Sequence, residues 1–448
     1  MTCRITPIPV TFMPMRNGLV VLALAAACYA LTLYVFYPGV MTYDAKYIYL
    51  ATKAAQSGDW QSPIMVAIWK FIDPLAPGAA SMFLLIITIY WTAFLLLALS
   101  IAPRSMPIAT LLLVAAALPP AFTLLGIIWR DILFAAVWLL AVVLPWCARD
   151  RAANIRIPVQ VIALLFAGLG ILLRPNALFA IPILAAYILW PAGFRFKRFA
   201  LAYIPLAIAS YALVPLVYYG ALNAKRENPL HSVFVFDLGG MSHFAKENQF
   251  PVTFTPEQTA LLINGCYQPT LWDIYWNRDP CKFVMAKLEG EAKMFGTPAL
   301  SSAWLKAVAA HPIAYLQHRV AFMRTLLFAD NLTLWTLDVE DPRLYLYTDR
   351  PAFMALRTID ETLKATPVMR AGTWLLIDVI ILGFAWRRRE TPEGAFAIGA
   401  CGSAAIYVLT FFPVGVAPDF RYAYWAVLAA IASAAVMLSA PRDADRKT

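Results

Sequence analysis

Charged side chains stand at the ends of four apolar stretches of this sequence, and their types fit the handling of a phosphate-linked group. They are Asp44, Arg130 with Asp131, Arg174, and Arg421. Guanidinium groups bind phosphate oxygens through two parallel hydrogen bonds. A nearby carboxylate can take the proton from an attacking hydroxyl. If the fold brings these residues together, the sequence therefore predicts a site that holds a lipid-linked phosphate beside a general base.

The same residues also have a purely structural interpretation. Thr42 or Asp44 is well suited to cap a helix that begins beside it. A salt bridge such as Asp131–Arg174 would tie two helix ends together. Charged groups at a membrane border are costly unless they pair or meet a charged ligand. The sequence leaves both interpretations open.

The composition defines the class of protein that must position these residues. The chain has 448 residues, of which 61% are hydrophobic and 14% charged, and a soluble domain cannot cover that much apolar surface. The net charge of +10 comes from basic clusters beside the apolar runs, whereas the segment 220–370 has equal numbers of acidic and basic residues. This distribution follows the positive-inside rule. It predicts a polytopic membrane protein and argues against a nucleic-acid partner.

The apolar runs predict about ten transmembrane helices. They lie at 18–37, 81–101, 107–128, 131–147, 157–173, 175–190, 199–219, 371–386, 394–412 and 423–440. The first run is interpreted as a retained span, because no clean cleavage site of a signal peptide ends it. With the N-terminus inside, every basic cluster falls in the cytoplasm and every charged end named above falls outside. The expected fold is thus an all-α polytopic membrane protein with both chain ends inside.

The runs divide the chain into three regions. These are 1–219, with a first outer loop at 38–80; an extracytoplasmic domain at 220–370; and 371–448, with C-terminal spans and a basic cytoplasmic tail. In the first outer loop, the helical pattern of Ala45–Gln56 and the apolar piece Ile64–Ile72 predict two short helices at the membrane surface.

The 220–370 region is expected to be a small, mostly helical domain. Cys266 and Cys281 lie in a segment predicted to be outside the membrane, where two cysteines are expected to form a disulfide. The pattern of apolar residues from Ala303 to Phe328 predicts one amphipathic helix.

Other titratable residues give no metal or cofactor signal. His311 and His318 are seven residues apart on one predicted helix face, and His231 and His243 lie in predicted loops, so the spacing does not indicate zinc. A divalent metal is compatible with the chemistry but is not supported by ligand spacing, and we predict no metal ligands. Asp378 lies inside an apolar run, where it either has a function such as proton coupling or pairs with a Tyr or Arg of another span. We favour the pairing.

The order of these features is similar to that of the GT-C superfamily, integral membrane glycosyltransferases that use polyprenyl-phosphate sugars. Members have a catalytic Asp in the first outer loop, soon after the first span, and an Asp/His-Pro-Pro-like element in the same loop. The matching stretches are Tyr37-Pro38-Gly39 leading to Asp44, Asp59-Trp60-Gln61-Ser62-Pro63, Trp129-Arg130-Asp131-Ile132-Leu133-Phe134, Leu173-Arg174-Pro175-Asn176-Ala177 and Asp419-Phe420-Arg421-Tyr422. The last three resemble the basic-Asp-aliphatic-Phe element, the Arg-x-Asn turn and the Asp-x-Arg-Tyr opening of the final span. The resemblance covers about 20–190 and 370–440.

The resemblance implies roles for the charged residues. Asp44 would be the general base, or the group that orients the acceptor nucleophile. Asp131 would be a second acidic group near the acceptor, or a metal ligand. Arg174 and Arg421, with Arg130 beside them, would hold the donor phosphate.

The resemblance also implies a substrate-binding set and has two departures. Tyr43 and Trp60 would stack on a sugar face, and Asn176 and Tyr422 would complete the set. Ser62 stands where many members carry His. The second acid is a single Asp131 rather than a paired acidic motif, which weakens the case for a tightly held metal.

The leading hypothesis is a glycosyltransferase of the bacterial inner (plasma) membrane with its active site facing the periplasm. It would move a sugar from a polyprenyl-phosphate donor to an extracytoplasmic lipid, glycan or protein acceptor, in contact with membrane lipids. One alternative is a transporter or flippase of lipid-linked sugars whose arginines form a phosphate gate. Another is an outer-face binding or assembly protein in which 220–370 is the working part.

Overall fold

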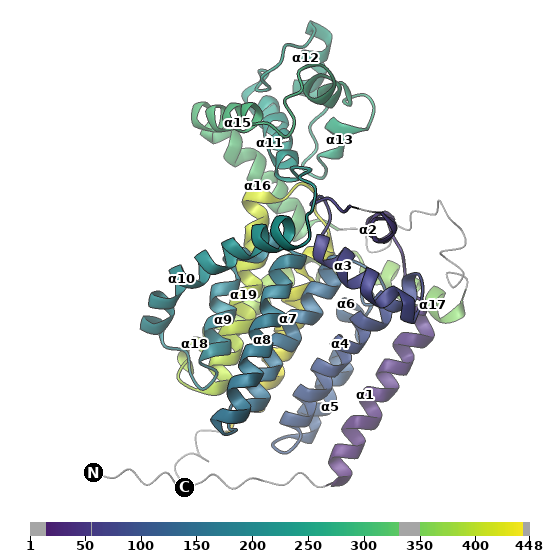
Figure 1. Ribbon diagram of the computed structural model, residues 1–448, viewed down its shortest axis with the longest axis vertical. Helices are drawn as coiled ribbons and strands as arrows, with labels where there is room; N and C mark the ends of the chain where they lie inside the picture. Colours follow the sequence, from purple (N-terminus) through teal and green to yellow (C-terminus); the bar gives the residue numbers. More distant parts are fainter. Residues whose placement is uncertain (1–14, 55, 331–349, 442–448) are drawn as a thin grey trace.

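The computed structural model describes residues 15–54, 56–330 and 350–441, and this part of the chain is helical throughout, with two isolated β-bridges and no strand. Seven helices are long and apolar enough to cross a membrane, as a multi-pass membrane protein requires. They are α1 (Met15–Phe36), α4 (Ala79–Ile101), α7 (Arg130–Ala148), α8 (Ala153–Leu173), α10 with the π-helix η3 (Phe196–Ala221), α19 (Pro392–Val414) and η7 with α20 (Phe420–Leu438). They stand side by side as a bundle (Figure 1).

Three shorter helices pack among these seven: α5 (Met106–Ala116), α9 (Ile181–Leu189) and α18 (Ala371–Arg387). Two of them are short because proline interrupts the apolar run. The run predicted at 107–128 breaks before Pro119, where the four-residue α6 (Pro119–Phe122) follows, and the run at 175–190 begins as the 3-10 helix η2 (Pro175–Phe179). Proline lacks an N–H donor and cannot continue a helix without losing a hydrogen bond. The total of about ten spans therefore stays a prediction.

The core of the bundle is built around α7, which packs on α4, α8 and α20. Nearly every side chain from Asp131 to Val143 is buried, and Trp138 and Trp146 are fully enclosed. Because α7 is surrounded by other helices, its N-terminal residues lie next to the ends of the neighbouring helices. This is the helix end at which Arg130 and Asp131 lie.

Two helices lie across one end of the bundle, at the positions expected in the first loop (Figure 1). They are α2 (Tyr43–Lys53) and α3 (Pro63–Ile72), the second followed by the 3-10 helix η1 (Asp73–Leu75). Helix α3 buries Met65 and Trp69 and leaves Phe71 82% exposed. We call this end of the bundle the site end and the opposite end the basic end.

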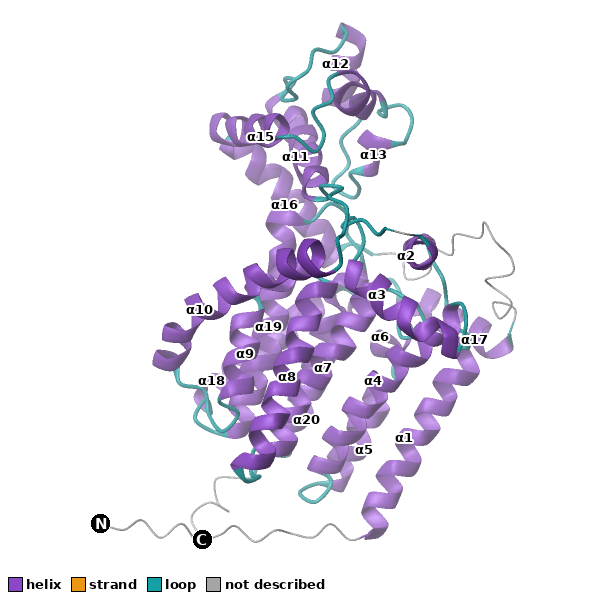
Figure 2. Ribbon diagram, in the orientation of Figure 1, coloured by secondary structure: helices purple, strands orange, loops and turns teal. Residues whose placement is uncertain are grey.

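A group of short helices protrudes from the site end (Figures 1 and 2). It consists of α11 (Leu230–Ala245), α12 (Pro256–Asn264), α13 (Asp273–Trp276), α14 (Phe283–Met285), the π-helix η4 (Ala286–Glu291), α15 (Pro298–Ala310) and α16 (Pro312–Phe328). The predicted disulfide between Cys266 and Cys281 is present here, with a separation of 15 residues. Helix α17 (Pro351–Leu363) is set apart and packs on α1, and the 3-10 helix η6 (Pro367–Met369) leads into α18.

The single helix predicted for Ala303–Phe328 is wrong. Helix α15 ends at Ala310, His311 adopts a non-helical conformation (φ −127°, ψ 55°), and α16 begins at Pro312. The residue before a proline is disfavoured in the α region, and proline is well tolerated at the first helical position. The break lets α15 and α16 pack on α11 as separate helices.

The disulfide generates a stability prediction. The variant Cys266→Ser/Cys281→Ser should lower the free energy of unfolding of the protruding helices by roughly 3 kcal/mol, since a closed loop of this length restricts the unfolded chain by about that amount. Limited proteolysis of the purified protein, followed through the 230–328 fragment, measures the change. A reductant should reproduce the effect in the wild type and have no further effect on the variant. Unchanged proteolysis in both would contradict the prediction.

Candidate active site

The first loop is joined to the segment before α7 by backbone pairing, which fixes Asp44 relative to Arg130 and Asp131. Val40 N–H donates to the Gly126 carbonyl (2.8 Å), and Ile128 N–H donates to the Val40 carbonyl (3.0 Å). Gly39, in the turn just before Val40, has φ +108°, a conformation that residues with a side chain rarely adopt. The local sequence therefore turns the chain back at the end of α1 and starts α2 beside the N-terminus of α7.

Arg421 is the centre of an ionic cluster at the site end. Its Nη1 lies 2.9 Å from Asp44 Oδ2 and its Nε lies 3.2 Å from Asp419 Oδ2, while Asp131 Oδ2 is 3.9 Å from the same Nε. The guanidinium also lies over the Trp129 ring, 4.4 Å from its centroid. One cation thus faces three carboxylates from three segments of the chain.

Arg174 forms the second centre of the cluster. Its Nη2 lies 2.8 Å from Asp131 Oδ1, and its Nε donates to the Tyr407 hydroxyl (3.1 Å). Arg174 directly follows the last residue of α8 and is 7% exposed, and Asp131 is 2% exposed. Asp131 lies between Arg174 and Arg421 and joins them into one network. The Asp131–Arg174 salt bridge expected from the sequence is therefore present. Asp131 also faces Arg421, and Arg174 also contacts Tyr407, which a simple link between two helix ends would not require.

The remaining residues predicted from the sequence lie around this cluster in different ways. Arg130 donates from Nη1 to the Trp60 carbonyl (3.3 Å) and forms no ion pair with another described residue. Tyr43 is 57% exposed. Asn176 donates to Thr410 Oγ1 (3.3 Å), and Tyr422 stacks on Phe411 with ring centroids 4.5 Å apart. Asn176 and Tyr422 therefore contribute to packing around the cluster.

The tertiary structure adds residues to which the sequence assigned no role. Gln61 Nε2 donates to Asp44 Oδ1 (3.2 Å), so it orients the carboxylate from the side opposite Arg421. Asp419 and Trp129 contact Arg421 directly. Gln61, Trp129 and Asp419 lie one or two residues from predicted site residues. This proximity is the local signal by which the sequence could have identified them. Tyr407 lies two turns before the end of α19, and no local pattern distinguishes it.

The structure modifies the capping interpretation of Asp44. Thr42 occupies the N-cap position of α2, but its side chain makes no capping hydrogen bond and instead accepts from Trp129 Nε1 (2.7 Å). Asp44 lies in the first turn, and its carboxylate contacts Arg421 and Gln61. A negative charge in a first helical turn is favourable in itself. The carboxylate nevertheless faces the cluster.

Asp44 and Asp419, the two partly exposed carboxylates of the cluster, have pKa values shifted in opposite directions. Burial alone would raise the pKa of Asp44, but the charges of Arg421 and Arg130 and the hydrogen bond from Arg421 outweigh it, so the pKa lies below its ordinary value. Burial raises the pKa of Asp419 to about 6, against the opposing charge of Arg421. Asp44 is therefore firmly ionised near neutral pH, whereas Asp419 exchanges its proton close to that range.

The Asp59–Pro63 stretch holds the loop between α2 and α3 in place. Asp59 accepts hydrogen bonds from the Tyr219 hydroxyl (2.7 Å) and the Glu227 backbone N–H (2.6 Å), and Glu227 Oε2 accepts from the Trp60 N–H (3.0 Å). Ser62 donates to the Leu172 carbonyl (2.9 Å). This serine therefore attaches the start of α3 to the end of α8, two residues before Arg174.

The protruding helices hold the loop that carries Asp419 and Arg421. Arg319 Nη1 donates to the Gly415 carbonyl (2.7 Å), and Trp272 N–H donates to the Val416 carbonyl (3.1 Å). Arg319 is itself fixed by Asp237, whose Oδ1 lies 2.6 Å from Arg319 Nη2, and both side chains are fully buried. The loop from α19 to η7 is thus attached to α13 and α16.

His318 completes this buried network without carrying a charge. Its Nε2 lies 3.2 Å from Asp237 Oδ1, and Trp304 Nε1 donates to Asp237 Oδ2 (2.7 Å). Burial lowers the pKa of His318, although Asp237 opposes the shift. The carboxylate of Asp237 is therefore paired with the charge of Arg319, and His318 and Trp304 fill its remaining positions.

Two further expectations concern groups outside the cluster. In the described parts of the chain, no three His, Cys, Asp or Glu side chains are grouped so as to hold a metal ion. Asp378 is fully buried beside Cys401, and neither carboxyl oxygen has a hydrogen-bond partner among the described residues. The pairing of Asp378 with a Tyr or Arg is therefore wrong, because its carboxyl group faces the Cys401 thiol of α19 instead.

The fold and the cluster together define a multi-pass helical protein with an ionic site at one end of its bundle. No protein family, curated protein or solved structure matches this chain. Function must therefore be argued from the residues of the site.

The Asp131–Arg174 pair can be tested as a unit. Arg174→Met should destabilise the protein by about 3–5 kcal/mol, since it leaves a buried carboxylate without its nearest charge partner. The double variant Asp131→Leu/Arg174→Met should recover most of that loss, because replacing a whole buried pair with apolar groups is often neutral. Thermal unfolding in one detergent compares the variants. Losses that simply add in the double variant would contradict the pairing.

Proposed function

We propose that this protein is an integral membrane glycosyltransferase that uses a polyprenyl-phosphate sugar as donor. In this proposal the bundle makes about ten crossings of a bacterial inner membrane, and the site end and protruding helices lie in the periplasm. The observation that carries the proposal is the ionic cluster around Arg421, which pairs with Asp44 directly and is linked through Asp131 to Arg174. The ordered resemblance of these segments to the GT-C superfamily supports the same conclusion.

Arg421 and Arg174 are the proposed ligands of the donor phosphate. Both lie at the site end, where the phosphate of a lipid anchored in the membrane would reach, and Arg130 lies beside them. Transfer converts a phosphodiester into a phosphomonoester, so negative charge develops on the leaving oxygen. Fixed guanidinium groups stabilise such charge without reorganisation. The arginines thus serve both binding and departure of the lipid phosphate.

Asp44 is the proposed acceptor of the proton. A hydroxyl of the acceptor attacks the anomeric carbon, the bond between that carbon and the phosphate oxygen breaks, and the hydroxyl proton passes to the Asp44 carboxylate. Before the donor binds, Arg421 holds the pKa of Asp44 low, which makes it a poor base. A phosphate that engages Arg421 would weaken this pairing and raise the pKa of Asp44. Donor binding would therefore prepare the base.

Aromatic side chains supply a proposed surface for the sugar or acceptor. The Trp60 ring lies 5.8 Å from Trp272 and 6.3 Å from Trp276, and the latter two stack on one another at 5.6 Å. Trp276 is 42% exposed, and Tyr43 is exposed on α2. Aromatic faces pack well against the apolar faces of sugar rings. Trp272 also holds the loop that carries Arg421. An acceptor that contacts Trp272 would therefore act directly on the position of Arg421 in the proposed donor site.

The substitution Asp44→Asn tests the proposal. In a deletion strain, mass spectrometry of envelope lipids and glycans identifies the sugar that is lost, and complementation measures its return. Asp44→Asn should reduce transfer at least about 100-fold, within the range that a general base contributes. Glu291→Gln removes a carboxylate that is 69% exposed on the protruding helices and should restore transfer fully.

The leaflet in which the donor accumulates separates the alternatives. For an enzyme, the lipid-linked donor should accumulate in the outer leaflet of cells that carry Asp44→Asn, whereas a transporter variant should leave it in the inner leaflet. Protein levels of both variants are compared by immunoblot. Wild-type transfer by Asp44→Asn would remove Asp44 from the reaction, and inner-leaflet donor would favour transport.

The raised pKa of Asp419 predicts a pH dependence. Asp419 must be ionised to pair with Arg421, so transfer should fall as the pH decreases through about 6 and be restored above it. Asp419→Asn should remove this acid limb, because the amide keeps its shape and does not titrate. Transfer is measured at donor concentrations far below saturation, where the limb reports the donor-free protein and the pKa of Asp44 is shifted downward. An acid limb that persists unchanged in Asp419→Asn would assign it to another group.

A further inference from the structure

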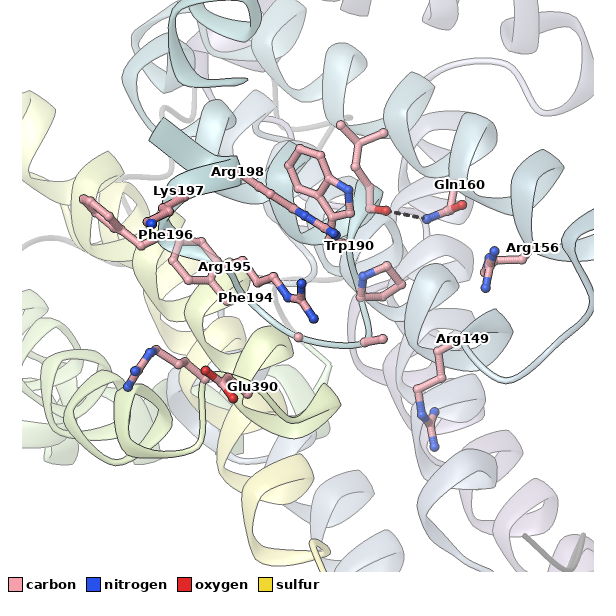
Figure 3. A pocket seen from close by; sticks show the side chains of 15 residues that line it. Arg149, Arg156, Gln160, Trp190, Phe194, Arg195, Phe196, Lys197, Arg198 and Glu390 are labelled. Atoms are coloured by element: carbon pink, nitrogen blue, oxygen red, sulfur yellow. Dashed lines mark hydrogen bonds between the residues drawn. The ribbon is translucent and has the colours of Figure 1, made fainter. Parts of the chain in front are cut away.

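A wide cavity of the described structure lies at the basic end, opposite the ionic cluster. It is a cavity of about 940 Å³ between the α7–α8 turn, the start of α8, the α9–α10 loop and the α18–α19 turn (Figure 3). Helices α8 and α19 each have one end at this cavity and the other at the cluster. The cavity is therefore a separate feature, and the proposed transfer reaction does not use it.

Positive charge dominates the lining of this cavity. The basic lining residues are Arg149, Arg156, Arg195, Lys197, Arg198 and Arg389, and Glu390 also lines it. Arg149 already lies 3.3 Å from Asp150 and over the Trp146 ring. Arg156, Arg195, Lys197 and Arg198 form no ion pair with another described residue. A hollow lined by one sign of charge focuses the electrostatic field and raises the local concentration of anions.

The walls of the cavity are held in place by hydrogen bonds between elements. Phe194 N–H donates to the Arg389 carbonyl (2.6 Å), which joins the α9–α10 loop to the α18–α19 turn. Gln160 Nε2 donates to the Leu189 carbonyl (3.1 Å; Figure 3) and to the Ile188 carbonyl (2.7 Å), which joins α8 to the end of α9. Arg156 and Arg195 thus face the hollow from two fixed walls. This arrangement differs from a diffuse positive surface.

The rim of the cavity continues into apolar side chains that face outward. Ile155 and Ile157 are 50% and 55% exposed on α8, and Phe196 and Leu201 are 60% and 80% exposed on α10. On a membrane helix such outward apolar side chains contact acyl chains. A ligand that fits both features has a phosphate head for the hollow and hydrocarbon tails for the rim. A free phosphorylated solute would leave the rim unused.

We propose that this cavity binds the anionic headgroup of a membrane phospholipid, with the phosphodiester between Arg156 and Arg195 and the acyl chains along α8 and α10. Basic pockets between helices at a membrane face are a recognised means of holding anionic lipid heads. Bound there, the lipid connects the α8, α10 and α18–α19 ends, which the protein itself joins through a few loop contacts.

Native mass spectrometry of the purified full-length protein tests the proposal. The detergent-solubilised protein is titrated with phosphatidylglycerol, with phosphatidylcholine as the zwitterionic lipid of matched chains and with glycerol phosphate as the soluble head. The wild type should bind phosphatidylglycerol in preference to both. Arg156→Gln/Arg195→Gln should weaken phosphatidylglycerol binding about 30-fold, since each basic residue near an anionic membrane surface contributes a factor of about five.

Arg151→Gln/Arg387→Gln is the matched control. It removes the same number of charges from exposed positions at the same end that do not line the cavity. Binding within about twofold of wild type in this variant supports the cavity. Equal weakening by both pairs would show a diffuse surface attraction and overturn the proposal, as would glycerol phosphate binding as tightly as the lipid. Thermal unfolding without added lipid confirms that both variants fold alike.

Discussion

The site end of this protein depends on how one guanidinium group is shared among carboxylates. Arg421 has three acidic neighbours, and Asp131 connects it to a second arginine that is almost fully enclosed. Removing ions from water is expensive, and the attraction between them offsets the cost only when several partners converge with good geometry. The helix ends at the site end are therefore constrained by charge as well as by shape. In the proposed enzyme, the same balance would let the arginines exchange a carboxylate for a phosphate.

The cluster exists only because distant segments are fixed to one another. Backbone pairing at Val40 places α2 beside α7, and Ser62 attaches α3 to the end of α8. Arg319 and Trp272 hold the loop before Arg421 from the protruding helices. The protruding helices are thus in direct contact with the element that carries the central arginine. In the proposed enzyme, acceptor recognition and donor binding would meet at this loop.

The two ends of the bundle handle charge differently. At the site end, arginines and carboxylates lie close together and nearly balance. At the basic end, several cations line one cavity with little acidic compensation, which accounts for part of the net charge of +10. Long-range charge asymmetry of this kind orients a membrane protein, and local convergence additionally creates binding sites.

The sequence by itself determined the class of the protein and four charged members of the cluster. Long apolar runs leave a chain few alternatives to membrane helices, and counting crossings placed Asp44, Asp131, Arg174 and Arg421 at one end, where the structure brings them together. The pairing of Cys266 with Cys281 followed from their location. These inferences hold because they depend on periodicity and on residue type.

Only the tertiary structure decided which groups meet. The division of Asp131 between two arginines and the attachment of Gly415 to Arg319 are contacts between segments far apart in the chain. Gln61 meets Asp44 because the loop between α2 and α3 folds back, and Asp378 meets no Tyr or Arg among the described residues. Pro312 is a local signal for the break between α15 and α16. The direction in which each helix continues is set by its packing on α11. Apolar periodicity states which face of a helix is buried and leaves its partner unspecified. The partner is set by loop pairing and by the crossing of helices, which no local pattern encodes.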